Sequence, residues 1–370
     1  MNAISEAKRL IVKIGSALLV DDATGHVRRA WLDSLCDDLA RARARGQEVI
    51  VVSSGAVAVG RRQLGLTPPL KLEEKQAAAA TGQIRLAHAY QEALARHGLT
   101  VAQVLLTLDD SEDRRRYLNA RSTLDTLLRL GAIPVINEND TVATAEIRFG
   151  DNDRLAARVA QMTAADALVL FSDIDGLYTG DPRKDKAAEF IPVVHELTPA
   201  IEAMAGDPGS AYGSGGMVTK LTAAKICLSA GCRMAIAPGK PMHPLQVVED
   251  GGRCTWFLPS AEPRTARKQW IFGSMNPAGA VVVDEGACKA LAMGRSLLPA
   301  GVTEVDGAFE RGDCILIRTP DGRALGRGLA AYSSDDARRI VRKRSAEIEA
   351  VLGYSYGDEL IHRDDMVVEG

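Results

Sequence analysis

The first 258 residues alternate between short apolar segments and longer segments with helical periodicity. This alternation predicts an α/β fold with a mainly parallel central sheet, covered by helices on both faces as a three-layer sandwich. The strands are expected at residues 9–20, 48–56, 100–106, 132–137, 165–172 and 232–238. The helices are expected at residues 30–46, 71–98, 113–131, 152–164 and 217–231.

The sequence changes character after residue 258. Residues 259–277 are polar and contain prolines, so they are predicted to be a linker. Residues 278–356 have short apolar segments separated by glycines, including the hairpin signal Pro-Asp-Gly-Arg at 320–323, and they predict a small β-rich domain. One helix is expected to close this domain over residues 335–353, and residues 357–370 are expected to form a C-terminal tail.

Charge, hydropathy and cysteine spacing narrow the class of protein. The formal net charge of −3 gives no reason to expect nucleic acid or an anionic membrane as the main partner. No apolar run approaches the roughly 20 residues that a membrane helix needs. The six cysteines form no CxxC pair, which is typical of free thiols in a reducing compartment, so a cytoplasmic location is expected.

Four of the predicted strands end in small, polar or charged residues. Ligands of open α/β sheets bind outside the carboxyl ends of the strands, so four such ends together predict a binding site. These ends are Gly15-Ser16 after Lys13, Ser53-Ser54-Gly55, Asn137-Glu138-Asn139-Asp140, and Ser172-Asp173.

Two lysines indicate a phosphate site. Lys13 interrupts an apolar strand, and burying an ammonium group without a partner is costly; the alternative is that it reaches the edge of the sheet. Lys220 follows the glycine-rich segment 213–216 by one helical turn. Consecutive backbone N–H groups and a helix N-terminus favour phosphate, although the spacing is not that of a Walker A loop.

Lysines and a phosphate-binding loop together favour phosphoryl transfer, which depends on positioning and charge stabilisation. The histidines suggest no catalytic set with serine or cysteine and no metal-ligand spacing. A carboxylate acceptor would need no base, since it is already ionised near neutral pH. No residue pattern identifies a magnesium ligand.

The polar segment 137–153 is predicted to bind an amino acid. Aspartate suits an α-ammonium group, and asparagine amides suit an α-carboxylate. The competing structural interpretation is that Asp151 or Asp153 caps the helix that follows. Capping by one of them leaves several other polar groups of the segment unexplained.

Eight motifs resemble those of the glutamate 5-kinase family, in which an amino acid kinase domain precedes a PUA domain. They are VKIGSALL, VSSGAVAVG, LNARSTL, PVINENDTVATAEI, GDNDRLAA, DIDGLYTGDPR, GSGGMVTKL and WIFG. The resemblance covers nearly the whole chain. It implies phosphorylation of the γ-carboxylate of L-glutamate by ATP with Mg²⁺, the first step of proline biosynthesis.

The resemblance also implies roles for individual residues. Lys13 and Lys220 would stabilise the transferring phosphoryl group, and Asp153 would hold both ammonium groups. The residues expected to bind glutamate are Ser54, Asp140, Asn152 and Asn137. Those expected to contact ATP are Lys13, Ser172, Asp173, Ser214, Gly215, Gly216, Met217, Val218, Thr219 and Lys220. The family often has serine where this chain has Val218, so this chain lacks a side-chain hydroxyl at that position.

The resemblance also implies partners: proline as a feedback inhibitor, a glutamyl-phosphate reductase that receives the product, and a homo-oligomer, with a tetramer as the expected form.

Two alternative functions remain open. One is a kinase of the same fold acting on N-acetylglutamate, aspartate, carbamate or UMP, although an acetylated substrate would not need the acids around Asp140. The other is RNA binding by the PUA domain, which is disfavoured because residues 276–370 hold 12 Lys/Arg against 16 Asp/Glu.

Overall fold

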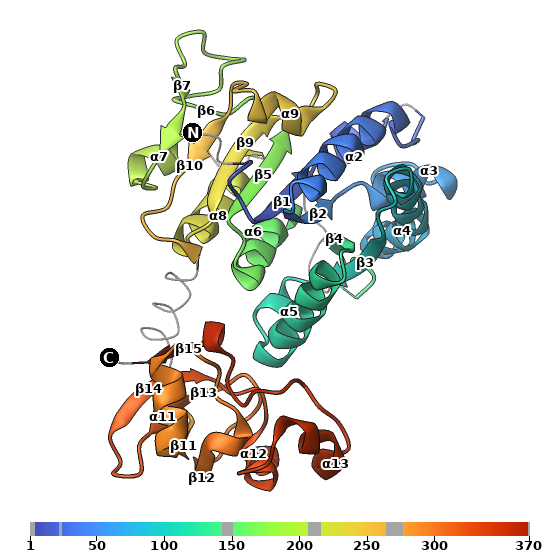
Figure 1. The fold of residues 1–370 in the computed structure, drawn as a ribbon. Helices are drawn as coiled ribbons and strands as arrows, with labels where there is room; N and C mark the ends of the chain where they lie inside the picture. The colour runs from blue at the N-terminus through green and yellow to red at the C-terminus, as the bar shows by residue number, and fades with distance from the viewer. Residues whose placement is uncertain (1–3, 22–23, 143–150, 206–215, 264–276, 369–370) are drawn as a thin grey trace. The chain divides into compact units, whose positions relative to one another are not determined.

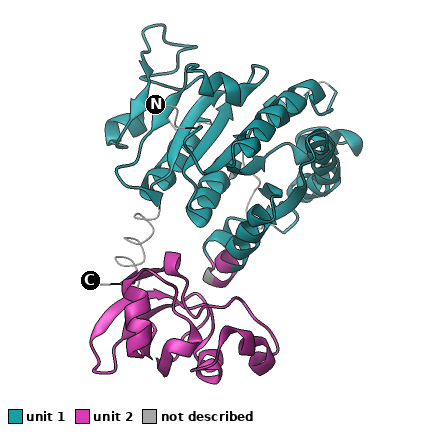
Figure 2. Cartoon of the chain, viewed as in Figure 1, with its two compact units in different colours: residues 1–112, 119–263 teal, residues 113–118, 264–370 magenta. Residues whose placement is uncertain are grey.

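The computed structural model describes the chain except residues 1–3, 22–23, 143–150, 206–215, 264–276 and 369–370 (Figure 1). The described chain divides into two compact units, residues 1–112 with 119–263 and residues 113–118 with 264–370 (Figure 2). Within the described residues, no helix has both the length and the apolar character to cross a membrane.

The first unit is built on an eight-stranded sheet whose first six strands run parallel, which confirms the predicted fold class. In spatial order the strands are β3 (Val101–Leu106), β4 (Ile133–Glu138), β2 (Glu48–Ser53), β1 (Arg9–Ile14), β5 (Ala167–Ser172), β9 (Arg233–Pro238), β10 (Thr255–Phe257) and β8 (Val193–Val194). The four strands with polar ends, β4, β2, β1 and β5, are neighbours. Their carboxyl ends therefore meet along one edge of the sheet.

Helices cover both faces of this sheet (Figure 1). The helices of the unit are α1 (Ser16–Leu19), α2 (Arg29–Ala44), α3 (Ala56–Gln63), α4 (Leu72–Ala95), α5 (Arg114–Arg129), α6 (Asp151–Thr163), α7 (Pro199–Ala203), α8 (Met217–Ser229) and α9 (Pro244–Glu249). The first turn of α5 belongs to the second unit. A small separate hairpin pairs β6 (Leu177–Tyr178) with β7 (Phe190–Ile191).

The alternation of side chains along β1 decides where Lys13 points. Leu10, Val12 and Ile14 join the core cluster that also contains residues of α2, α4 and α9. Successive side chains of a strand point to opposite faces, so Lys13 faces the other side of the sheet. Helices α6 and α8 pack together on that side, and α6 contacts β1.

The second unit contains a five-stranded sheet. Its strands in spatial order are β12 (Val302–Gly307), β11 (Gly279–Val283), β13 (Cys314–Arg318), β14 (Ala324–Leu329) and β15 (Met366–Val368). The predicted hairpin at residues 320–323 joins β13 to β14, and Gly322 has the positive φ of +86° that its turn requires. Strand β15 comes from the segment expected to be a tail.

The expected helix over residues 335–353 is wrong, because the chain leaves the helical conformation between two shorter helices. The unit contains α11 (Glu285–Ala292), α12 (Ser334–Ile340) and α13 (Ile348–Leu352). Arg342 has φ +61° and its N–H donates to the carbonyl oxygen of Pro299 at 3.0 Å. The break lets both Ile340 and Ile348 enter the core of the unit.

Candidate active site

One buried carboxylate contacts two buried lysines. Asp153 Oδ1 lies 2.5 Å from Lys13 Nζ, and Asp153 Oδ2 lies 3.0 Å from Lys220 Nζ. The three residues come from α6, β1 and α8, and they are 1%, 6% and 8% exposed. Lys13 therefore has the partner that its burial requires and does not reach the edge of the sheet.

The triad of Lys13, Asp153 and Lys220 contains two basic groups and only one acidic group. Burial lowers the pKa of Lys13, and Lys220 lowers it further, although Asp153 acts in the opposite direction. Burial by itself would raise the pKa of Asp153, but the two ammonium groups outweigh it and hold that pKa below the usual value. Two ammonium groups around one ionised carboxylate leave an excess positive charge, which an anionic ligand would neutralise.

Residues at the start of α8 complete this part of the site. Gly216 is the N-cap of α8 and provides no side chain to occupy the first N–H groups of the helix. The hydroxyl of Thr219 lies 3.1 Å from both Asp153 Oδ2 and the carbonyl oxygen of Gly216, and its one proton is shared between these two acceptors. Met217 is buried and Val218 is half-buried, whereas Ser214 and Gly215 lie outside the described residues.

Three of the predicted substrate residues form a second cluster. Asn152 Nδ2 donates to Ser54 Oγ at 2.9 Å and to Asn137 Oδ1 at 3.2 Å. Asn152 directly precedes Asp153 on α6, so this cluster and the lysine triad share one turn of helix. The Oδ1 atom of Asn152 is buried, and no described residue donates a hydrogen bond to it.

The other predicted residues that the structure describes lie at the expected strand ends. Asp140 follows β4 and is 7% exposed. Ser172, the last residue of β5, donates from Oγ to Asp173 Oδ1 at 3.1 Å. Asp173 borders a cavity of about 610 Å³ together with Leu18, Trp31 and Lys240.

The alternative that Asp153 caps α6 is not supported, since both of its carboxylate oxygens face lysines. Asp151 begins α6, but its side chain is not among those that the structure describes.

Sequence reasoning missed two residues of α4. The Oε1 atom of Gln83 accepts a hydrogen bond of 2.7 Å from Asn137 Nδ2, and the hydroxyl of Tyr90 lies 3.0 Å from Ser53 Oγ. Both side chains are buried. The available signal was spacing: Gln83 stands four residues after Ala79 and three before Leu86, on the apolar stripe of the helix.

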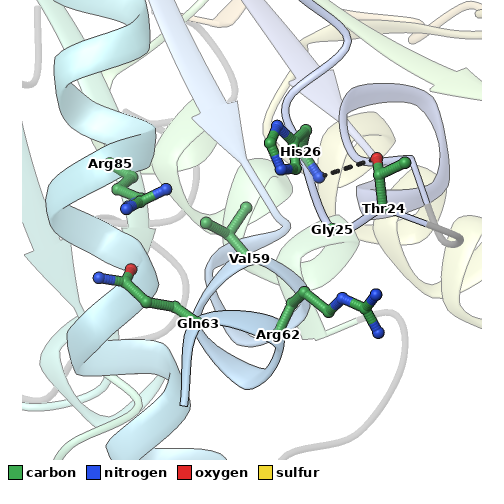
Figure 3. Close-up of a pocket in the computed structure, with 7 residues that line it drawn as sticks. All are labelled: Thr24, Gly25, His26, Val59, Arg62, Gln63 and Arg85. Atoms are coloured by element: carbon green, nitrogen blue, oxygen red, sulfur yellow. Dashed lines mark hydrogen bonds between the residues drawn. The ribbon is translucent and has the colours of Figure 1, made fainter. Parts of the chain in front are cut away.

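A second pocket lies beside α3 and α4 and contains none of the predicted site residues. It has a volume of about 440 Å³ and is lined by Thr24, Gly25, His26, Val59, Arg62, Gln63 and Arg85 (Figure 3). Arg85 points from α4 into this space, two residues after Gln83 (Figure 3).

Comparison with known proteins places these features in a family. Residues 8–238 match the model of the amino acid kinase family, and residues 279–352 match the PUA domain. A glutamate 5-kinase of Paramagnetospirillum magneticum is 78% identical over the full length of both chains. A glutamate 5-kinase of Rhodospirillum rubrum is 63% identical, over 97% of this chain and 96% of its relative.

A solved structure supports the fold independently. A carbamate kinase from Giardia lamblia bound to AMP-PNP aligns with 69% of this chain and 100% of its own, with a TM-score of 0.51 and 14% identity. Family models, full-length relatives and fold agree: the chain belongs to the amino acid kinase family and, within it, to the glutamate 5-kinases.

Proposed function

We propose that this protein transfers the γ-phosphoryl group of ATP to the γ-carboxylate of L-glutamate, giving L-glutamyl 5-phosphate and ADP. The observation that carries the proposal is the triad of Lys13, Asp153 and Lys220 directly beside the amide cluster of Asn152. The triad supplies positive charge for a phosphoryl group, and the amide cluster supplies donors and acceptors for an amino acid. The reaction would be the first step of proline biosynthesis.

The lysines would stabilise the charge that spreads over the phosphoryl oxygens during transfer. Such electrostatic groups are effective when they are already in place and shielded from water, as Lys13 and Lys220 are. Asp153 would hold both ammonium groups in position without touching the substrate. The glutamate γ-carboxylate is ionised near neutral pH, so it would attack the γ-phosphorus in line without a general base.

ATP would bind along Ser172, Asp173 and the segment that leads into α8. The N-terminus of α8 behind Gly216 favours phosphate, and Thr219 and Lys220 stand within its first turn. Mg²⁺ would enter with the phosphates, because this ion keeps several waters and binds through substrate oxygens with one or two carboxylates. The described residues contain no group of three metal-binding side chains.

Glutamate would lie beside Ser54, Asn137 and Asn152, with Asp140 as a buried carboxylate for its ammonium group. A free ammonium matches both Asp140 and the open acceptor Asn152 Oδ1. The acetylated amine of N-acetylglutamate has no charge to offer these groups. Free glutamate is therefore the preferred acceptor.

Several further properties are proposed from family membership. Residues 1–258 would be the catalytic domain and residues 278–356 the PUA domain. The protein would act in the cytoplasm as a homo-oligomer, with a tetramer as the expected form, and proline would inhibit it at or near the glutamate site. Its product is a labile acyl phosphate, which favours transfer to a glutamyl-phosphate reductase.

The function is tested by measuring ADP release with Mg·ATP and a panel of acceptors, with hydroxylamine present to trap an acyl phosphate. Turnover with L-glutamate, recovered as the γ-hydroxamate and reduced by proline, is expected. The panel includes N-acetylglutamate, aspartate, carbamate and UMP. Turnover with one of these in place of glutamate would retain the kinase fold and reject the substrate assignment.

A further inference from the structure

We propose that Gln83 is a positioning residue for the acceptor substrate. It would accept from Asn137 Nδ2 and so help the N–H of Glu138 hold a chain of side-chain amides in the direction that leaves Asn152 Oδ1 facing the substrate as a hydrogen-bond acceptor. The inference rests on the proposed function, because it takes glutamate as the molecule beside Asn152.

The amide chain runs from α4 to the carboxyl end of β2. Gln83 Oε1 accepts from Asn137 Nδ2 at 2.7 Å, and Asn137 Oδ1 accepts from Asn152 Nδ2 at 3.2 Å. Asn152 Nδ2 also donates to Ser54 Oγ at 2.9 Å. Gln83 is thus the outermost member of a chain that ends on a predicted substrate residue.

The direction of each amide follows from its neighbours. The backbone N–H of Glu138 can only donate, and it donates to Asn137 Oδ1 at 2.9 Å. Asn137 Nδ2 must then find an acceptor elsewhere, and Gln83 Oε1 is that acceptor. With Asn137 held this way, the NH₂ group of Asn152 turns towards Asn137 and Ser54. Its oxygen is left as a buried acceptor without a donor among the described residues.

Close helix packing holds both ends of this chain. A Cβ atom on Gly82 would lie 1.9 Å from the carbonyl oxygen of Ala56, and one on Gly60 would lie 1.8 Å from that of Ala78. The two glycines therefore let α3 and α4 approach until their backbones touch. Gln83 follows Gly82 on α4, and Ser54 precedes the N-cap of α3, so one contact sets the distance between the two ends.

An acceptor atom held towards the ligand suits an ammonium group, since a cation makes a stronger hydrogen bond to it than a neutral donor does. Loss of Gln83 Oε1 would leave the buried Asn137 Nδ2 without its acceptor, and the Asn137 and Asn152 amides could then reorient. Gln83 would act only through these amides, so its loss should weaken glutamate binding more than the chemical step.

The test compares Gln83→Met, which keeps the length of the side chain but removes its amide, with Gln83→Glu, which keeps an acceptor oxygen. In Gln83→Met the KM for L-glutamate should rise about tenfold, the effect of roughly one lost hydrogen bond. Its kcat and its KM for ATP should stay within about threefold of wild type. Gln83→Glu should restore most of the glutamate KM. Arg85→Met is the matched control, because Arg85 lies on the same helix and points into the other pocket (Figure 3).

Thermal unfolding of each variant shows whether it is folded at the assay temperature. A folded Gln83→Met protein with the wild-type KM for glutamate would overturn the proposal. A fall in kcat and a rise in the glutamate KM that are equal in the Met and Glu variants would also overturn it, because they would indicate general damage to the site. Wild-type turnover with L-glutamate is measured first. If that turnover is absent, the proposed function fails, and the role of Gln83 fails with it.

Discussion

Lys220 Nζ lies 3.0 Å from Asp153 Oδ2, although 67 residues separate the two in the chain. The same carboxylate contacts Lys13 on the central strand β1. One aspartate thus joins the sheet to two helices packed on the same face, and it holds two cations ready for an anion.

Replacing Lys220 with alanine should reduce kcat by about a hundredfold or more, because a preorganised charge for the phosphoryl group is lost. The fold should survive, since Lys13 still neutralises Asp153. Steady-state kinetics with Mg·ATP and L-glutamate measures the effect, and circular dichroism confirms the fold. Lys225→Ala is the matched control on the same helix; its exposed ammonium group lies 3.4 Å from Glu202 and should be dispensable. A Lys220→Ala enzyme with a near-normal kcat would remove Lys220 from the mechanism.

Replacing Asp153 with asparagine should destabilise the protein by about 3–5 kcal/mol, because two buried ammonium groups lose their only strong counter-charge in the described chain. Activity should fall as well, since the lysines would no longer be held in place. Chemical denaturation monitored by circular dichroism measures the stability. Asp335→Asn, whose side chain is 90% exposed, should change the stability very little. Equal stabilities for the two variants would contradict the structural role of Asp153.

The lowered pKa of Lys13 predicts an alkaline decline of activity below pH 10.5, the ordinary pKa of a lysine. The decline should appear in kcat/KM for ATP, which reports the free enzyme, and should move to higher pH in kcat, because bound phosphates favour the charged lysine. An active Lys13→Arg enzyme should lack this decline, because arginine does not titrate there. If wild type and Lys13→Arg showed the same alkaline decline, the decline would belong to a titrating group other than Lys13.

The lowered pKa of Lys13 also predicts the direction in which the free energy of unfolding changes with pH. Between the lowered folded pKa of Lys13 and 10.5, the unfolded chain holds more protons at this site than the native protein does. The contribution of Lys13 to the free energy of unfolding should therefore rise with pH across that window. Comparing wild type with Lys13→Met at several pH values in denaturant isolates this contribution. A difference that is constant with pH would mean that the pKa of Lys13 is the same in both states.

Replacing Gly82 with alanine should destabilise the protein by a few kcal/mol, at least about 2, because the new methyl group would overlap the backbone of α3. The glutamate KM should rise too, since Gln83 lies on α4 and Ser54 lies just before α3. Gly180→Ala is the control, because the atoms nearest to its added Cβ lie at 3.9 and 4.0 Å. Thermal unfolding and glutamate kinetics give both readouts, and an undisturbed Gly82→Ala protein would show that the helices can separate at little cost.

The sequence by itself determined the sheet and the residues at its edge. Alternating apolar and helical segments predicted β1, β2, β4 and β5, and the polar residues that end these strands do meet at one edge. These features depend on local periodicity and on a general rule of parallel sheets, so a single sequence carries them. The family motifs added the expectation that Asp153 serves both lysines, which agrees with the distances in the structure.

Tertiary structure decided what depends on contacts between distant segments. The sequence predicts only that Gln83 belongs to a long helix; the structure, in which α3 and α4 approach closely at Gly60 and Gly82, brings it within reach of Asn137. The second unit shows the same limit. The helix breaks at Arg342 because the break lets Ile340 and Ile348 enter the core, although the local sequence favours a helix. Strand β15 forms because it can pair with β14 at the edge of the sheet, although its sequence was expected to be a tail. Local propensities are worth tenths of a kcal/mol per residue, whereas burying a large apolar side chain is worth about 1.5–3 kcal/mol, so packing prevails where the two disagree.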